Sequence, residues 1–322
     1  MSDGFQLIPA RASTMAYHID DLVLFLLCVT AFFTILIFSL IIIFVVKYRR
    51  KNPNDIGKNI GEHHWLEWTW IIIPSLIEVV MFVWGAALYV RMSRPPANSL
   101  EIQVIGKQWM WKIQHPSGRK EIDELHIPVG RPIKLVMTSQ DVIHSFFIPE
   151  FRVKQDVVPG RYSTEWFTPT KIGQYHLFCS EYCGTGHASM AGRVVVMSPA
   201  DYAKWEANVP LDQTPEASGA KLFLEYGCMT CHGQQAPSLA GIYGRQQTMS
   251  TGEVVTVDDD YLRESILNSR AKIVAGYPPV MPGYQGQLSE EQVMDLISYI
   301  KSLQGAATLP APNLPQNGGS PP

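Results

Sequence analysis

Two long apolar stretches near the start of the chain are followed by a region in which apolar and polar positions alternate over short distances. Residues 22–46 contain no charged side chain, and in residues 69–90 Glu78 alone is charged. Each stretch is long enough to cross the roughly 30 Å apolar core of a bilayer as a helix. We therefore predict a transmembrane hairpin over residues 22–92, preceded by an N-terminal extracytoplasmic segment, 1–21.

The charges around these stretches indicate how the hairpin is oriented. The connection between them is rich in basic residues, whereas their outer flanks hold few: Lys47, Arg49, Arg50, Lys51 and Lys58 against Arg11, Arg91 and Arg94. Under the positive-inside rule the connection lies in the cytoplasm, and both termini lie outside. Glu78 would be costly in contact with lipid, so we expect it to face a partner helix. The alternative, two buried helices of a soluble domain, fits the length of the stretches poorly.

Short apolar runs separated by turn residues occupy residues 93–200. Examples are 101–105, 133–137 and 193–197, with glycine and proline between them. Several short strands at this spacing are typical of a β-sandwich or a Greek-key barrel. We predict an all-β domain in this region.

A linker, 201–215, leads to a helical region at 216–304. Helices are expected at three places, 217–226, 259–267 and 289–303. The last of them opens with a capping-box sequence that begins at Ser289. The final residues, 305–322, are rich in Pro, Gly and Ala and are predicted to form a disordered tail.

Length and charge limit the classes of partner. The chain has 322 residues, enough for more than one domain, and a formal net charge of −3. A protein that binds nucleic acid usually presents a basic surface. The sequence therefore predicts no nucleic-acid partner.

A dense group of metal-binding side chains lies in the predicted all-β region. It reads Cys179-Ser-Glu-Tyr-Cys183-Gly-Thr-Gly-His187-Ala-Ser-Met190, and His144 precedes it. Two thiolates, two imidazoles and a thioether form a soft donor set that suits copper. A mononuclear blue-copper site would leave one thiolate over, whereas two thiolates that bridge two copper ions would use all five side chains. A disulfide between the cysteines would leave the other three residues unexplained, and a thioether is a poor zinc ligand.

A second group, Cys228-Met-Thr-Cys231-His232, has the spacing by which a c-type haem is attached. The two thiols would form thioether bonds to the haem, and His232 would be its proximal ligand. Met281 lies in a loop before the last predicted helix and is the expected sixth ligand, since His/Met ligation suits a high reduction potential. Met294 is its rival, but it falls within that helix and is expected in the core.

The first group, together with Asp141-Val-Ile-His144, resembles subunit II of haem-copper cytochrome c oxidases. The resemblance implies a cupredoxin-like domain that carries the dinuclear copper centre CuA. The ligands that it implies are the side chains of His144, Cys179, Cys183, His187 and Met190 and the backbone carbonyl of Glu181. It also implies that the Glu181 side chain points towards a magnesium ion at the boundary with subunit I.

Two further stretches carry the same resemblance. Residues 106–111, Gly-Lys-Gln-Trp-Met-Trp, are similar to the family's Gly-x-Gln-Trp-Tyr-Trp, with Met110 in place of the usual tyrosine. This match implies that Trp109 lies where electrons enter from cytochrome c, although a tryptophan in a strand can equally pack a core. Residues 67–74 are similar to the start of the family's second helix, which implies that Glu67 lies at the mouth of the K proton pathway of subunit I. From the residues alone, Glu67 is equally an interfacial acid.

The haem motif and the residues after it resemble class I cytochromes c, in which a proline carbonyl, here that of Pro237, lies against the proximal histidine. The chain as a whole resembles subunit II of a bacterial caa-type oxidase. The expected architecture is a two-helix transmembrane hairpin, an all-β cupredoxin-like Greek-key domain and an all-α class I cytochrome c domain.

The resemblance also implies a function and partners. Electrons would pass from an external donor, such as cytochrome c or a cytochrome bc complex, to haem c, to CuA and on to subunit I, where oxygen is reduced to water with proton pumping. The implied partners are subunits I and III and the lipid of a bacterial cell membrane, and no oxygen-reducing site is expected in this chain. Two alternatives stay open: the electron-accepting subunit of a CuA-containing nitric oxide reductase, and a free-standing membrane-anchored electron carrier.

Overall fold

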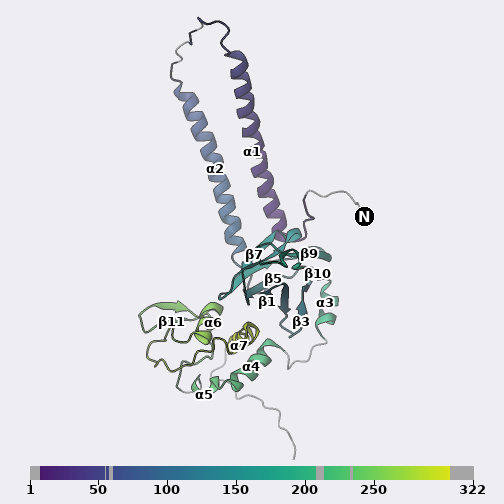
Figure 1. Ribbon diagram of the computed structural model, residues 1–322, viewed down its shortest axis with the longest axis vertical. Coiled ribbons are helices and arrows are strands. Elements are labelled where there is room, and N and C mark those ends of the chain that lie inside the picture. Colours follow the sequence, from purple (N-terminus) through teal and green to yellow (C-terminus); the bar gives the residue numbers. More distant parts are fainter. Residues whose placement is uncertain (1–7, 55, 58–60, 208–213, 233–234, 305–322) are drawn as a thin grey trace, which may run out of the picture.

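The fold is that of a computed structural model, which describes residues 8–54, 56–57, 61–207, 214–232 and 235–304. Two long helices extend together from a β-sheet domain, and a smaller helical domain lies against that domain (Figure 1). The helix hairpin, the β-sheet domain and the C-terminal helical domain expected from the sequence are confirmed. The predicted disordered tail lies outside the described residues.

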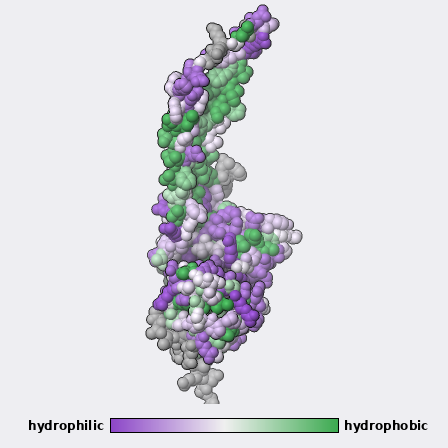
Figure 2. Space-filling view, turned by 90° about the vertical axis from the view of Figure 1, so that its left-hand side faces the viewer, coloured by the Kyte–Doolittle hydropathy of each residue, from purple (hydrophilic) through white to green (hydrophobic). Residues whose placement is uncertain are grey.

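The hairpin consists of α1 (Thr14–Lys47) and α2 (His64–Met92). Both helices are long and apolar enough to cross a membrane. Their most apolar stretches are not buried by any other described part of the protein. Figure 2 shows this apolar surface along the hairpin, whereas the domains below it are mainly hydrophilic. Both helices start earlier than predicted, because polar residues at their ends continue the helical turns beyond the apolar stretches.

The early start of α1 has a specific cause, since this end of the helix is docked into the β-sheet domain. The Ser13 hydroxyl caps the helix by accepting from the Ala16 amide at 3.0 Å, and it donates to the Phe151 carbonyl at 2.7 Å. Ala12 and Met15 are buried beside it. The last part of the predicted N-terminal segment, 1–21, therefore forms the first turns of α1.

Arg152 fixes the same junction. Its guanidinium forms a two-pronged pair with the Asp20 carboxylate, at 2.9 Å and 3.0 Å, and donates to the carbonyls of Pro149 and Pro9, each at 2.7 Å. Two parallel charge-assisted bonds hold the partners in one geometry. Arg11 also pairs with Asp20 at 2.8 Å. The membrane hairpin and the β-sheet domain are thus joined by more than the covalent chain.

The β-sheet domain contains two five-stranded sheets. The first has the order β3-β2-β1-β5-β8 and the second β4-β10-β9-β6-β7. The strands of the first are β1 (Leu100–Lys107), β2 (Met110–Gln114), β3 (Lys120–Ile122), β5 (Ile133–Ser139) and β8 (Ser163–Phe167). Those of the second are β4 (Glu124–Pro128), β6 (His144–Ile148), β7 (Val153–Val157), β9 (Gly173–Cys179) and β10 (Ala191–Met197). One hydrophobic core, which includes Trp111, Phe146 and Phe167, is shared by residues of both sheets.

The predicted linker begins as a helix rather than as an open connection. Helix α3 (Pro199–Glu206) packs on the β-sheet domain through two aromatic side chains. Trp205 stacks on the His126 ring with centroids 4.7 Å apart, and the Tyr202 hydroxyl lies 3.2 Å from His115 Nδ1. The Glu121 carboxylate bridges the two histidines. The sequence missed this helix because its docking depends on residues far away in the chain.

The C-terminal domain is mainly helical. Its helices are α4 (Pro215–Glu225), α5 (Cys228–His232), α6 (Asp259–Leu267) and α7 (Glu290–Ser302). The capping box expected at Ser289 is confirmed, with Gln292 as its second member. A short hairpin of β11 (Gln246–Thr248) and β12 (Val254–Thr256) is added to the expected helices. Threonine and valine favour strands here, and Gly252, at φ +87°, lies in the connection.

Helices α4 and α7 cross at Gly219. A Cβ atom at this position would lie 2.0 Å from the Asp295 carbonyl oxygen and 2.8 Å from the Tyr299 Cβ. The two backbones therefore approach more closely than any other side chain would allow. This crossing supports the domain core, to which α7 contributes Val293, Leu296, Ile297, Tyr299 and Ile300.

Candidate metal centre and haem site

The first cluster forms where two strands of the second sheet meet a loop. Cys179 is the last residue of β9, and its pairing with Phe146 brings His144, the first residue of β6, to the same end of the sheet. The loop that follows holds Cys183, and His187 begins a short 3-10 helix, η2 (His187–Ser189). Two adjacent strand ends and the loop that follows one of them thus supply all the predicted side chains.

The five side chains converge on one small volume. The sulfurs of Cys179 and Cys183 are 3.8 Å apart and not bonded to each other. His144 Nδ1 lies 3.9 Å from the Cys179 sulfur, and His187 Nδ1 lies 3.6 Å from the Cys183 sulfur. The Met190 sulfur lies 3.8 Å from the Cys183 sulfur. The Glu181 carbonyl oxygen, the sixth predicted ligand, lies 3.3 Å from the Cys179 sulfur.

The two thiols affect each other's ionisation. Burial alone would raise the pKa of Cys179, but contact with His144 and with backbone groups of Glu181 and Ser145 lowers this pKa to about 6. Burial and the neighbouring Cys179 raise the pKa of Cys183 to about 12. The pair on its own therefore favours a single negative charge. Bound cations would stabilise two adjacent thiolates, and the soft donor set suits copper.

Asp141 orients one of the predicted ligands, a role that sequence reasoning did not assign. Its Oδ1 lies 2.8 Å from His144 Nε2, so Nδ1 of that ring is left to face the sulfurs. Its Oδ2 accepts from the Gln108 amide at 2.7 Å. A carboxylate that fixes the outer nitrogen of a histidine is common behind metal ligands. The signal in the sequence was an aspartate three residues before the histidine.

The tryptophans at 109 and 111 have different environments. Trp109 is 39 % exposed, and its indole N–H donates to the Cys183 carbonyl at 3.2 Å, beside a bond of 2.8 Å from the Gln108 amide group. Trp111 is fully buried and meets the His144 ring edge-on. Gly186 packs directly under Trp109, since a Cβ there would lie 2.4 Å from the indole. Trp109 is thus a surface residue that touches the metal-binding loop, and Trp111 belongs to the core.

The predicted acids lie apart from the cluster or on its surface. The Glu181 side chain is exposed. Glu67 lies in the first turn of α2, with its carboxylate 3.2 Å from His64 Nδ1. Glu78 is exposed in the middle of α2 and has no hydrogen-bond or ion-pair partner among the described residues. Its predicted partner helix therefore stays a prediction.

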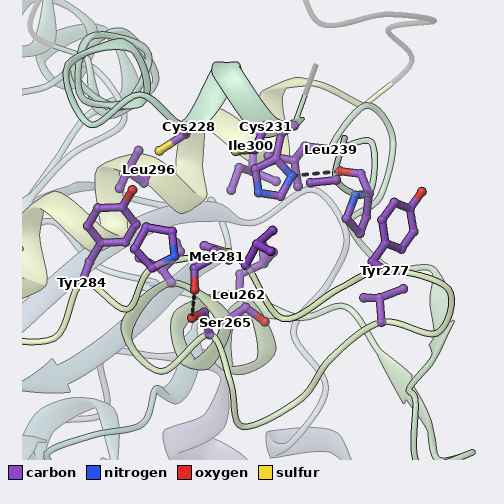
Figure 3. A pocket seen from close by; sticks show the side chains of 18 of the residues that line it. Cys228, Cys231, Leu239, Leu262, Ser265, Tyr277, Met281, Tyr284, Leu296 and Ile300 are labelled. Atoms are coloured by element: carbon purple, nitrogen blue, oxygen red, sulfur yellow. Dashed lines mark hydrogen bonds between the residues drawn. The ribbon is translucent and has the colours of Figure 1, made fainter. Parts of the chain in front are cut away.

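The second cluster lines a cavity of about 320 Å³ inside the C-terminal domain. Its lining includes Cys228, Cys231, His232 and, from the distant loop before α7, Met281. Figure 3 shows Met281 across the cavity from the two cysteines, with Leu262 and Ser265 nearby. A largely apolar cavity with thiols at one side and a thioether at the other fits a flat, covalently attached haem.

The geometry around His232 suits its predicted role as an iron ligand. Its Nδ1 donates to the Pro237 carbonyl at 2.9 Å, so Nε2 carries no proton and points away from that bond. Burial lowers the pKa of His232, which favours the neutral, ligating form. The Met281 loop is held by the Ser269 hydroxyl, which donates to the Met281 carbonyl at 2.6 Å. Met294, the rival ligand, lies against Ile105 and Val136 of the β-sheet domain, outside the cavity lining.

Comparison with known proteins assigns families to the three parts of the chain. A family model described as the cytochrome c oxidase subunit II transmembrane domain matches residues 2–88. The model for the periplasmic domain of the same subunit matches residues 119–198, and the cytochrome c model matches residues 216–304. The matches follow the order of the hairpin, the β-sheet domain and the helical domain.

Similar proteins carry the same name. Cytochrome c oxidase subunit 2 of Alkalihalophilus pseudofirmus is 28% identical over 307 residues, which cover 90% of this chain and 88% of that protein. Alternative cytochrome c oxidase subunit 2 of Bradyrhizobium diazoefficiens is 28% identical over 224 residues, 58% of this chain and 79% of that protein. The crystal structure of the periplasmic domain of subunit II of cytochrome oxidase of Bradyrhizobium japonicum is 32% identical, covers 36% of this chain and 96% of that one, and has a TM-score of 0.35. On the family models and the similar sequences, the chain belongs to the cytochrome c oxidase subunit II family and carries a cytochrome c domain after its subunit II portion.

Proposed function

We propose that this chain is the electron-accepting subunit of a haem-copper terminal oxidase, and that it passes electrons from an external donor through haem c and CuA to subunit I. Subunit I would reduce oxygen to water and pump protons. The observation that carries the proposal is that one chain holds a donor set for two copper ions and a cavity for haem c in two adjoining domains.

The ligand roles follow from the geometry of the two sites. We assign CuA to the side chains of His144, Cys179, Cys183, His187 and Met190 with the Glu181 carbonyl, and haem c to Cys228, Cys231, His232 and Met281. When bound, each group takes up and releases one electron at a time. The protein contributes orientation, since Asp141 fixes one copper ligand and the Pro237 carbonyl fixes the proximal histidine.

Three further residues are proposed to act where this chain meets its partner proteins. Trp109 is proposed as the point near which electrons reach CuA, because it is exposed and bonded to the carbonyl of a ligand residue. The exposed Glu181 side chain is proposed to bind magnesium at the contact with subunit I. Glu67, at the start of α2, is proposed to lie at the mouth of the K proton pathway of that subunit.

The proposed setting is a bacterial inner membrane, with the basic connection of the hairpin in the cytoplasm and both soluble domains on the other side. Subunits I and III would pack against the apolar surface of α1 and α2. A carboxyl group such as Glu78, exposed on that surface, supports a protein partner in the membrane. The external donor would be a cytochrome c or a cytochrome bc complex.

The test is oxygen consumption by the complex isolated through a tag on this chain, with an artificial electron donor. We expect rapid, cyanide-sensitive uptake. Cys179→Ser should remove the CuA absorption and the uptake while haem c stays reducible by the donor. A preparation with intact haem c and CuA signals that takes up no oxygen would refute the oxidase and favour nitric oxide reduction or a lone carrier.

A further inference from the structure

Two faces of helix α7 make packing contacts with different parts of the protein. One face packs inside the cytochrome c domain, where Leu296 and Ile300 line the haem cavity. The other lies on the first sheet of the CuA domain (Figure 1). The residues of this second face lie three or four positions apart, as expected for one side of a helix. They are Glu291, Met294, Asp295, Ser298 and Lys301.

Each residue of the second face meets a partner on the sheet. The Glu291 carboxylate accepts from Lys112 Nζ at 2.7 Å, and Asp295 accepts from the Gln114 amide group at 3.0 Å. Further along, the Gln103 amide group donates to the Ser298 hydroxyl at 2.9 Å, and Lys301 donates to Glu101 at 2.7 Å. The helix therefore runs antiparallel to β1, with its N-terminus at the β1 end that carries residue 107.

This contact is mainly polar. Its apolar centre consists of Met294, Ile105 and Val136, with Tyr162 packed against it, and it is separate from the cores of the two domains. Ion pairs surround that centre, and the Lys112–Glu291 pair keeps 31 % and 24 % of its side chains exposed. Contacts of this composition resemble reversible protein interfaces more than the interior of a domain.

The N-terminal end of α7 lies close to the copper ligands. Besides Lys112, the Glu291 carboxylate accepts from the Gln140 amide group at 3.0 Å. Gln140 immediately precedes Asp141, which holds His144. A single carboxylate thus joins the cytochrome c domain to the backbone segment that orients a CuA ligand.

Part of the wall of the haem cavity is exposed to solvent. The loop around Met281 exposes Tyr277 by 40 % and Val280 by 65 % at the edge of the haem cavity. Met294 and Asp295, which lie on the docked face of α7, are not part of that lining. The exposed loop is the surface at which an external donor would approach the haem.

We propose that the polar face of α7 is the surface by which the cytochrome c domain docks on the CuA domain for electron transfer, and that Glu291 is its positioning residue. The inference rests on the proposed function. In the step that it serves, one electron leaves reduced haem c and enters oxidised CuA, and no bond forms or breaks. Since the ion pairs are partly exposed, salt should weaken the docking.

The test uses charge reversal in the complete oxidase. Haem c is reduced by a flash-excited ruthenium reagent, and the appearance of the electron at CuA is followed by absorbance. Lys112→Glu and Glu291→Lys should each slow this transfer by roughly tenfold at low salt, because like charges then face each other across the contact. The double variant, which restores the pair in reverse, should recover a rate close to that of the wild type. The wild-type rate should also fall as salt is added.

Two controls make the outcome decisive. Arg193 and Glu124 form an exposed pair at 2.8 Å on the second sheet, so Arg193→Glu should leave the transfer rate unchanged. A carbodiimide, which condenses a carboxylate and an amine into an amide with loss of water, should join Glu291 to Lys112 in the full chain. Mass spectrometry should find this cross-link with or without bound copper, and Glu291→Gln should abolish it.

The docking is refuted if single reversals leave the rate unchanged, if the double variant stays as slow as the single ones, or if the cross-link does not form. Failure of the proposed function looks different. In that case the wild-type complex would lack the CuA or haem c absorption, whatever the state of Glu291.

Discussion

The crossing of α4 and α7 permits a prediction in which two physical effects have opposite signs. Replacing Gly219 by alanine adds one methyl group inside a helix. Helix propensity alone would make the variant more stable by about 1 kcal/mol. The crossing predicts the reverse, because the new Cβ would lie 2.0 Å from the Asp295 carbonyl oxygen, whereas ordinary contacts begin at 3.4 Å.

The size of the effect follows from that overlap. The two helices would have to separate by about 1.4 Å at the crossing, and neither partner is a flexible side chain, since the nearest atoms are the backbone of Asp295. Forced overpacking costs about 1–3 kcal/mol, and the size of this overlap against rigid atoms places the cost at the upper end of that range. After subtraction of the helix-propensity gain, we expect a net loss of about 2 kcal/mol, a large part of the stability of a small domain.

The assay is guanidinium unfolding of the full chain in detergent, followed by haem absorbance so that the signal comes from the cytochrome c domain alone. Ser218→Ala, one residue earlier on α4, serves as the control and should leave the midpoint unchanged or slightly higher. A Gly219→Ala protein as stable as the wild type, or more stable, would show that the helices do not approach as described.

Three further predictions concern single residues. Burial raises the pKa of Asp295 to about 6 from 3.8, so the protonated carboxyl stabilises the fold at low pH, and this stabilisation is lost as pH rises towards 6. Asp295→Asn should therefore be more stable than the wild type, by an amount that grows to about 3 kcal/mol between pH 4 and 7. Unfolding of the haem domain measures this difference in stability. Met281→Ala should lower the haem c reduction potential in a redox titration and leave the CuA absorption unchanged. Arg152→Ala should lower the melting temperature of the CuA domain, because the mostly buried Asp20 loses its main partner at a cost of roughly 3 kcal/mol. An unchanged melting temperature would show that Arg11 alone can pair with Asp20.

Most residues of the two sites could be predicted from short stretches of the sequence. Cys179, Cys183, His187 and Met190 lie within one short stretch of the chain, so their spacing alone restricts where their side chains can point. The haem motif is similarly compact, and its helix, α5, places both thiols on the cavity. His144 and Met281 come from elsewhere in the chain, and their residue types, each of which completes a donor set, indicated them.

Long-range polar packing could not be predicted in the same way. Tyr202 and Trp205 looked like linker residues, because their partners, His115 and His126, belong to strands far earlier in the chain. Glu291 and Lys301 likewise had the pattern of a solvated helix face. A charged side chain at helical spacing fits water or an oppositely charged surface equally well, and the sequence of α7 does not distinguish the two. That choice depends on how two domains meet.

The anchored start of α1 ties the β-sheet domain directly to the membrane hairpin. Ser13 and the Asp20–Arg152 pair hold the two parts together, so in the proposed complex the protein itself would set the height of the copper site above the bilayer. The cytochrome c domain is held instead by partly exposed ion pairs around a small apolar centre. In the proposed relay, any variation in the spacing between redox centres would therefore fall on the outer step, where a transient donor must also be accommodated, and not on the step towards the membrane.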